Sequence, residues 1–348
     1  MARTDFHPLK VAAVERLTDD AAAVTFDIPA ELDATFAFAP GQSLTLKRGA
    51  ERRSYSICAP AGRPPRIGVR EVAGGAISGW LVHQVRPGDV IEVQPPAGSF
   101  SPDLTASGTH VLIAAGSGIT PLLSIAASVL AAHADATVTL LYGNRRSDTV
   151  MFADDIADLK DAHPARLNVV HILSREVPEV ELFAGRIDAG KLRRLLPLTV
   201  DVPAVDHWWL CGPYAMVADA IGVLTGLGVD PSRMHRELFY VGETPAEVQH
   251  VDAPVGPGAE VTVILDGRRS TVVVPPGVAV LDGVQRVRPD LPFACKGGVC
   301  GTCRALLTHG EVRMRRNYAL EKAEIDAGYV LTCQALPTTE TVTVDYDS

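Results

Sequence analysis

The sequence is short of positive charge and has no long apolar run. It carries 32 Lys and Arg against 41 Asp and Glu, a net charge of −9, so we expect no nucleic-acid partner. The most apolar stretch, residues 119–132, is too short to cross a membrane, so we expect no membrane partner either. Residues 1–8 lack the apolar segment of a secretory signal, which favours a cytoplasmic protein.

The chain also lacks internal repeats and low-complexity segments. Its 348 residues are enough for two or three domains, and 47% hydrophobic residues can fill several cores. The composition therefore predicts an ordinary multidomain globular protein.

Cysteine is scarce, yet four of the six cysteines form a pattern. Cys295, Cys300 and Cys303 are spaced C-x4-C-x2-C, and Cys333 follows at a distance. This is the plant-type pattern in which four thiolates hold a [2Fe–2S] cluster. Three glycines in the loop allow its backbone to approach the sulfurs closely and to adopt unusual φ angles.

Three other interpretations of these cysteines are a structural zinc site, a disulfide framework and buried thiols. Structural zinc usually uses paired C-x2-C knuckles, and only one pair here has that spacing. Disulfides are unexpected in a chain without a secretory signal. The cluster is therefore the favoured prediction, and Cys58 and Cys211 remain as single cysteines.

Residues 11–96 contain short alternating or β-rich runs that Gly and Pro separate. Several short strands at this spacing predict a closed barrel or a sandwich, interrupted by one helix at 78–85. The strands are predicted at 11–18, 22–28, 43–47, 54–58, 66–72 and 90–94.

From residue 110 onward, strand and helix patterns alternate, which predicts a parallel α/β sheet of the nucleotide-binding type. The strands are predicted at 111–115, 137–142, 167–173 and 207–211. The helices are predicted at 121–133, 151–160, 188–195 and 214–227.

Residues 241–259 are not periodic and predict an exposed linker. A hairpin is predicted next, with strands 261–265 and 270–274 joined at Asp266-Gly267. A helix near 278–287 and strands at 304–307 and 341–346 complete a β-rich unit of about the size of a plant ferredoxin.

Residues 116–121, Gly-Ser-Gly-Ile-Thr-Pro, connect a predicted strand to a predicted helix. Gly116 and Gly118 let a diphosphate touch the backbone, and Thr120 is expected as the N-cap with Pro121 as the first helical residue. The helix N-terminus then offers free N–H groups to an anion. An ordinary strand–helix turn would show a similar pattern, but the position at the first α/β turn favours a nucleotide.

Two motifs of the β-rich region suit a flavin. Arg53, Tyr55 and Ser56 offer phosphate pairing, ring stacking and a hydrogen bond to the isoalloxazine, although a charged surface strand would look alike. Residues 74–78 precede a helix and suit a second diphosphate, or simply cap that helix.

Arginines follow two of the predicted parallel strands, where open sheets bind nucleotides. Arg145 and Arg146 follow one strand, and Ser174 and Arg175 the next, which favours the 2′-phosphate of NADPH over NADH. The pattern leaves open which arginine contacts that phosphate. Cys211, at the end of the fourth strand, is either a packing residue or a neighbour of the nicotinamide.

These motifs come in the order typical of ferredoxin–NADP reductase-like flavoproteins, which the chain resembles. The motifs are residues 53–56, 74–78, 116–121, 142–145, 211–213 and 237–239. With the cluster motif after them, essentially the whole chain resembles the reductases of multicomponent oxygenases. More narrowly, it is similar to the phenylacetyl-CoA epoxidase reductases at residues 6–9, 295–300, 317–321 and 328–337.

The resemblance implies three domains and a linker. These are an antiparallel β-barrel FAD domain (1–106), a parallel α/β NADP-binding domain (107–240), the linker (241–259) and a β-grasp [2Fe–2S] ferredoxin domain (260–348).

The resemblance also implies cofactor contacts. Tyr55 is expected on the flavin ring, Ser56 near its reactive nitrogen, and Cys211 near the nicotinamide. The residues expected at FAD are Arg53, Tyr55, Ser56, Gly75, Ser78 and Phe239. Those expected at NADPH are Gly116, Gly118, Thr120, Arg145, Ser174, Arg175, Cys211 and Gly212. The expected cluster ligands are Cys295, Cys300, Cys303 and Cys333.

The implied activity is electron transfer from NADPH through FAD and the cluster to an oxygenase that docks transiently at the cluster loop. We expect no acid–base catalytic residue. The implied partner is the di-iron phenylacetyl-CoA epoxidase, and the alternative is a Rieske-type or 3-ketosteroid 9α-hydroxylase system. A non-enzymatic zinc-binding interaction protein is the alternative from another class.

Overall fold

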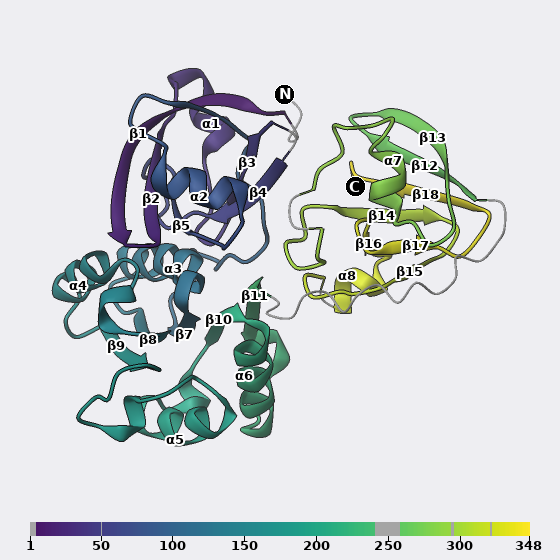
Figure 1. Ribbon diagram of the computed structural model, residues 1–348. Helices are drawn as coiled ribbons and strands as arrows, with labels where there is room; N and C mark the ends of the chain where they lie inside the picture. Colours follow the sequence, from purple (N-terminus) through teal and green to yellow (C-terminus); the bar gives the residue numbers. More distant parts are fainter. Residues whose placement is uncertain (1–4, 50, 241–257, 294–295, 321) are drawn as a thin grey trace. The chain divides into compact units, whose positions relative to one another are not determined.

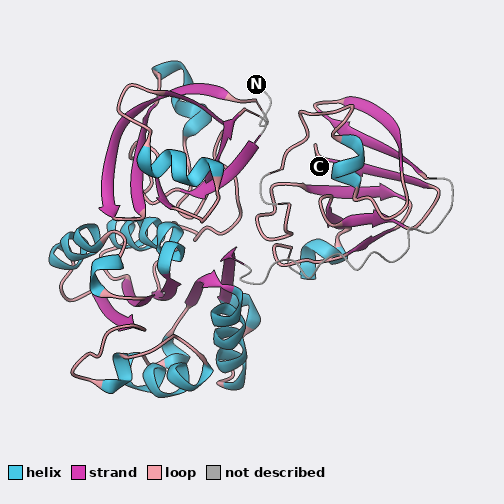
Figure 2. Ribbon diagram, in the orientation of Figure 1, coloured by secondary structure: helices cyan, strands magenta, loops and turns pink. Residues whose placement is uncertain are grey.

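The computed structural model describes residues 5–49, 51–240, 258–293, 296–320 and 322–348. The chain divides into two compact units. We call residues 6–51 and 55–242 the larger unit, and the part dominated by residues 243–348 the C-terminal unit. Figure 1 shows the path of the chain, and Figure 2 shows its helices and strands.

The N-terminal part is a six-stranded antiparallel sheet in the order β4-β3-β6-β1-β2-β5. Its strands are β1 (His7–Thr18), β2 (Ala21–Asp27), β3 (Ser43–Arg48), β4 (Glu51–Ser56), β5 (Arg66–Arg70) and β6 (Val90–Val93). A bridge between Ile57 and Ile67 joins the two ends of the order, so the sheet closes as a barrel. The short helices are α1 (Asp33–Phe36) and α2 (Ala76–His83).

The alternating pattern of these strands fills the barrel. Leu9, Phe26, Leu44 and Ile67 are completely buried, while polar residues on the opposite faces of the strands meet solvent. The antiparallel β architecture predicted for this region is therefore confirmed.

The second part of the larger unit is a parallel five-stranded sheet in the order β11-β10-β7-β8-β9. Its strands are β7 (Thr109–Ala115), β8 (Thr137–Asn144), β9 (Leu167–Leu173), β10 (His207–Pro213) and β11 (Met234–Tyr240). Its helices are α3 (Ile119–Ala132), α4 (Ala153–Ala162), α5 (Ala189–Thr199) and α6 (Tyr214–Gly226). The predicted α/β domain is confirmed, but strand β11 was not predicted.

The helices cover both faces of this sheet. Helices α3 and α4 lie on the side toward the barrel, and α5 and α6 on the opposite side (Figure 1). The strand order reverses between β7 and β10, and such a reversal opens a crevice at the carboxyl ends of the strands.

The barrel and the parallel sheet share a core. Cys58 and Phe100 pack in one buried cluster with Leu112 and Trp209. The Ser124 hydroxyl of α3 also donates to the carbonyl of Ala59 at 2.6 Å. These contacts fix the barrel against the sheet within the larger unit.

The C-terminal unit holds a mixed sheet in the order β13-β12-β18-β14-β16 and a small β15–β17 ribbon. Its strands are β12 (Ala259–Leu265), β13 (Arg268–Val274), β14 (Arg304–His309), β15 (Val312–Met314), β16 (Tyr329–Leu331), β17 (Ala335–Pro337) and β18 (Thr341–Asp345). Its helices are α7 (Val280–Val284) and α8 (Lys322–Asp326).

The predicted hairpin turn is confirmed at Asp266 and Gly267, which have φ of 51° and 68°. Of the predicted linker, residues 241–257 lie outside the described residues, and Ala259 belongs to β12. Among the described residues, no helix has the length and apolar character that a membrane span needs.

Candidate nucleotide and cluster sites

Most residues predicted at NADPH lie at one edge of the parallel sheet. Gly116 follows β7, Arg145 follows β8, and Ser174 follows β9, while Cys211 and Gly212 lie near the end of β10. Because all these strands run parallel, their carboxyl ends share one edge. The fold therefore brings together residues that the sequence places far apart.

The turn after β7 rests directly on the end of β10. Gly116 has φ +55°, a left-handed conformation that favours glycine. A Cβ atom at Gly118 would lie 2.2 Å from the carbonyl oxygen of Cys211. Only glycine fits at Gly118 without moving the backbone, so the turn keeps its amides close to the crevice.

The expected capping role of Thr120 is wrong. Helix α3 begins at Ile119 with Gly118 as its N-cap, and no side chain caps it. Thr120 lies inside the first turn, where its hydroxyl donates to the carbonyl of Ser117 at 2.9 Å. Pro121 is consequently the third helical residue rather than the first, a position whose N–H needs no partner within the helix.

Ser56, Cys211 and Glu237 meet where the barrel adjoins the carboxyl edge of the parallel sheet. The Ser56 hydroxyl donates to Glu237 Oε2 at 3.3 Å. Burial raises the pKa of Glu237 to about 7, against the lowering effect of the Ser56 hydrogen bond. Burial and the nearby Glu237 together raise the pKa of the Cys211 thiol. The Glu237 carboxyl can therefore hold a proton near neutral pH.

Glu237 was missed as a site residue because the strand that carries it, β11, was not recognised. Its neighbour Phe239 is partly buried against the core that includes Cys211 and Trp209. The Glu237-Leu238-Phe239 motif was visible in the sequence, but only the register of β11 beside β10 places its carboxyl near Cys211.

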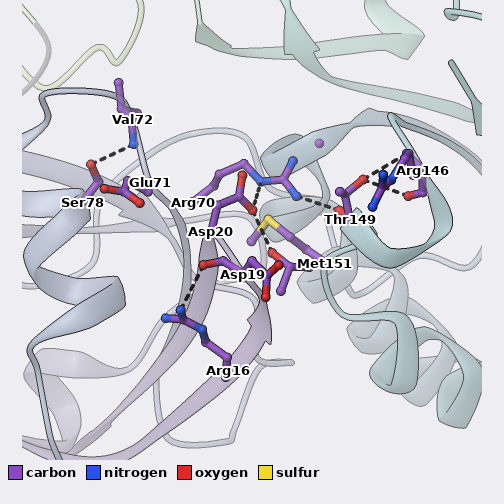
Figure 3. Close-up of polar contacts among 12 residues, drawn as sticks. Arg16, Asp19, Asp20, Arg70, Glu71, Val72, Ser78, Arg146, Thr149 and Met151 are labelled. Atoms are coloured by element: carbon purple, nitrogen blue, oxygen red, sulfur yellow. Dashed lines mark hydrogen bonds and ion pairs between the residues drawn. The ribbon is translucent and has the colours of Figure 1, made fainter. Parts of the chain in front are cut away.

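The flavin motifs lie on the barrel. Tyr55 packs partly buried against the barrel core. The Arg53 guanidinium donates to the carbonyl of Arg52. Gly75 is the N-cap of α2, and the Ser78 hydroxyl accepts from the Val72 amide at 3.1 Å (Figure 3). Ser78 thus holds the loop that leads into α2.

Arg70 was not predicted, although it lies beside the nucleotide turn. From β5, its Nε lies 3.3 Å from Asp20, and its Nη2 donates to the Thr149 carbonyl at 2.7 Å (Figure 3). Its Nη1 lies 3.2 Å from where a Cβ atom of Gly116 would be. A barrel residue therefore brings positive charge to the turn after β7.

Asn144 is a second residue that the sequence did not single out. It is 7% exposed, and neither atom of its side-chain amide has a hydrogen-bond partner in the described structure. It lies next to Tyr142, whose hydroxyl donates to the carbonyl of Gly116 at 3.0 Å. A buried amide without partners at this edge fits a polar ligand.

The arginines at the edge differ in their partners. Arg146 forms an ion pair with Asp148. Arg145 and Arg175 are exposed and form no ion pair with a described carboxylate. The Arg175 amide donates to the Arg145 carbonyl at 2.7 Å, so these two arginines are neighbours.

The C-terminal unit gathers the described cluster cysteines. Cys303 shares a side-chain hydrogen bond with Cys333, and Cys300 is close enough to influence the Cys303 thiol electrostatically. Cys295 lies outside the described residues. In the described part, no group of three or more metal-ligating side chains is placed to hold a metal ion. Three neighbouring thiols nevertheless fit a two-iron cluster, whose thiolates surround a wider cage than one ion does.

The loop around these cysteines is braced by its neighbours. The Gln334 amide donates to the carbonyl of Lys296 at 2.8 Å and lies 3.5 Å from Cys333 Sγ. Gly298 and Gly301 have φ of +80° and +68°, as the predicted close approach of the backbone requires. These contacts hold the loop against the segment that carries Cys333.

Three domain families match the chain in consecutive segments. They are the oxidoreductase FAD-binding domain over residues 8–101, the oxidoreductase NAD-binding domain over 112–221 and the 2Fe-2S iron-sulfur cluster binding domain over 263–338. These matches establish FAD, NAD(P)H and a 2Fe-2S cluster as the cofactors and substrate.

Curated relatives match over nearly the full length. The chain is 42% identical to a subunit of the 1,2-phenylacetyl-CoA epoxidase of Escherichia coli, over 99% of both chains. It is 35% identical to the ferredoxin reductase component of the 3-ketosteroid-9-alpha-monooxygenase of Mycobacterium tuberculosis, over 97% of this chain and 95% of that one. The fold resembles that of phthalate dioxygenase reductase, with a TM-score of 0.62, 23% identity and 98% of both chains covered.

Proposed function

Because the chain belongs to the family of FAD- and 2Fe-2S-containing oxygenase reductases that includes the Escherichia coli relative, we propose that it reduces a phenylacetyl-CoA epoxidase. The protein is an NAD(P)H-dependent electron-transfer reductase and a subunit of a multicomponent oxygenase. The main support for this choice of oxygenase is the 42% identity to the Escherichia coli relative over 99% of both chains.

The chemistry that FAD supplies when bound is the conversion of an electron pair from NAD(P)H into single electrons that a [2Fe–2S] cluster can accept. The protein's part is placement. We propose that Ser56 and Tyr55 orient the flavin ring and that residues 116–118 hold the dinucleotide diphosphate at the crevice. Glu237, with its pKa of about 7, can keep a proton beside the Ser56 hydroxyl.

We propose that Arg70 and Asn144 complete the diphosphate and ribose environment. The Arg70 guanidinium next to Gly116 supports this role, because charge-assisted hydrogen bonds to phosphate are about twice as strong as neutral ones. The Asn144 amide, buried without partners, can be satisfied by a ligand hydroxyl or phosphate oxygen.

We also propose that NADPH is the preferred electron donor, with Arg145 and Arg175 at its 2′-phosphate. These neighbouring arginines are exposed and form no ion pair with a described carboxylate, whereas Arg146 is paired with Asp148. Arg175→Ala is expected to raise KM for NADPH about tenfold and leave KM for NADH within about twofold. Arg146→Ala is the matched control, and equal increases for both dinucleotides in Arg175→Ala would refute the assignment.

The experiment that tests the choice of oxygenase is NADPH-dependent epoxidation of phenylacetyl-CoA by a reconstituted oxygenase component. We expect turnover that depends on this chain. A second candidate is a 3-ketosteroid 9α-monooxygenase, because 35% identity also extends over 97% of the chain. Reduction of the steroid oxygenase without reduction of the epoxidase would favour that second candidate.

A further inference from the structure

A segment rich in arginine lies directly against the cluster loop. Strand β15 carries Arg313, and Arg315 and Arg316 follow at its end. The Arg315 amide donates to the carbonyl of Gln334 at 3.0 Å, and its guanidinium donates to the carbonyl of Cys333 at 3.2 Å. Figure 1 shows the β15–β17 ribbon at one end of the C-terminal unit.

The same segment also touches the other stretch of cluster ligands. The amide of Tyr318 donates to the carbonyl of Gly298 at 3.0 Å. A Cβ atom at Gly298 would lie 3.3 Å from the carbonyl oxygen of Arg316. Residues 313–316, which we call the arginine segment, therefore contact both the loop before Cys300 and the segment that carries Cys333.

The charges of the arginine segment are not neutralised within the described structure. Arg313 and Arg315 are exposed, Arg316 is partly exposed, and none forms an ion pair with a described carboxylate. Some other cations of this unit do have carboxylate partners, as in the pairs of Lys296 with Asp282 and of Arg304 with Glu324.

We propose that the arginine segment is the docking surface for an acidic face of the oxygenase component. This inference rests on the proposed function, because it requires that electrons leave the chain at the cluster for another protein. A guanidinium pairs with carboxylates through two parallel hydrogen bonds, so arginines suit an acidic protein surface. Their contact with the cluster loop places that surface where the electron leaves.

The other conceivable occupant is the larger unit of the same chain, which must deliver electrons to the cluster. The two units are covalently joined, so each meets the other at an effective concentration in the millimolar range. A separate oxygenase meets the cluster at its own, lower concentration and gains far more from long-range attraction. The uncompensated arginines therefore serve the intermolecular encounter.

The test removes two positive charges from the arginine segment without touching Arg315, whose guanidinium holds the Cys333 backbone. In R313Q/R316Q we expect kcat/KM for the reconstituted oxygenase to fall about tenfold at low salt, and the Kd of the complex to rise by a similar factor. R268Q/R269Q is the matched control: it removes the same charge from exposed residues of β13, the edge strand opposite β16. We expect this control to stay within about twofold of the unaltered chain.

Two measurements distinguish docking of the oxygenase from docking of the larger unit: the salt dependence of oxygenase reduction and the rate of electron transfer within the chain. Raising ionic strength from about 0.01 M to 0.15 M shortens the screening length from about 30 Å to about 8 Å. The higher salt should lower kcat/KM of the unaltered chain for the oxygenase toward the value of R313Q/R316Q. It should change kcat/KM of the variant less.

Reduction of the cluster by NADPH without oxygenase, followed by stopped flow, should be unchanged in R313Q/R316Q. If R313Q/R316Q slowed this internal reduction of the cluster as much as it slowed oxygenase reduction, the proposal would be overturned in favour of docking to the larger unit.

Two substitute electron acceptors allow the docking proposal to be tested without knowing which oxygenase is the partner. Cytochrome b5 presents an acidic surface and cytochrome c a basic one, and both accept one electron. R313Q/R316Q should reduce cytochrome b5 about tenfold more slowly at low salt and cytochrome c no more slowly. If R313Q/R316Q slowed the reduction of both cytochromes equally, the proposed docking surface would be refuted. If the unaltered chain fails to reduce the phenylacetyl-CoA oxygenase while the cytochromes behave as expected, only the proposed partner is refuted.

Discussion

The two electron-handling sites of this chain are built in opposite ways. In the C-terminal unit, Cys300 and Cys303 come from one loop, and Cys333 joins them by side-chain contact. In the larger unit, Ser56 and Glu237 share a hydrogen bond although 181 residues separate them in the sequence. Most of the predicted cluster ligands come from one short loop, whereas the residues proposed for the flavin and the dinucleotide come from strands of two sheets. The cluster site can be predicted from the spacing of its cysteines in the sequence, whereas the flavin and dinucleotide site depends on strand order.

The largest effect should come from breaking the loop-built site. Cys300→Ser removes one of the four predicted thiolate ligands, and we expect loss of the cluster and of oxygenase reduction by more than about a hundredfold. NADPH-dependent reduction of ferricyanide at the flavin should stay within about twofold, because most residues proposed for the flavin lie in the larger unit and the cluster cysteines lie in the C-terminal unit. The visible spectrum and iron content measure the cluster, the reconstituted oxygenase assay measures oxygenase reduction, and the ferricyanide assay measures flavin reduction. Loss of flavin reduction while FAD stays bound would contradict the independence of the sites.

A large effect is also expected at the turn after β7. In Gly118→Ala the new methyl group would lie 2.2 Å from the Cys211 carbonyl oxygen, although the φ of −62° suits alanine. The clash should cost about 1–3 kcal/mol and lower Tm by roughly 5 °C, with slower reduction of FAD by NADPH. Gly222→Ala in helix α6 is the control, because no atom lies within 4 Å of the added methyl group. It should raise the free energy of unfolding by about 0.5–1 kcal/mol. The two substitutions should therefore change stability in opposite directions.

The sequence predicted the fold and the cluster motif because both depend on local patterns. Alternating apolar residues identified most strands of the barrel, and the loop around Cys300 was visible from spacing alone. Thr120 was wrongly expected as a helix cap, because the tight turn at Gly116–Gly118 starts α3 two residues earlier.

Arg70 and Glu237 escaped the prediction for a different physical reason. Each lies on a strand whose sequence gives no sign of what it will face. Arg70 reaches the Gly116 turn only because the barrel packs against the parallel sheet, and Glu237 reaches Ser56 only because β11 pairs with β10. Contacts between distant elements become visible only once strand order and domain packing are known.

A moderate effect is expected from the barrel's contribution to the nucleotide site. Arg70→Gln should raise KM for NADPH and NADH alike, each about tenfold, because the diphosphate is common to both. This uniform loss contrasts with the selective loss expected for Arg175→Ala. Arg86→Gln removes an equally charged but exposed barrel residue and should leave both values within about twofold. A change confined to NADPH in Arg70→Gln would place Arg70 at the 2′-phosphate instead.

The smallest effect should be the pH dependence that Glu237 gives to stability. Burial raises the pKa of this carboxyl from 4.5 to about 7, so the folded protein binds its proton more tightly than the unfolded chain does. The resulting stabilisation is complete below pH 4.5 and is lost as the pH rises through about 7. Glu237→Gln keeps a neutral side chain at every pH, so its Tm relative to the unaltered protein should rise by a few degrees between pH 5 and pH 8.5. Thermal unfolding at both pH values measures this difference. A constant Tm difference would mean that Glu237 titrates normally and that the Ser56 contact does not lie in a desolvated site.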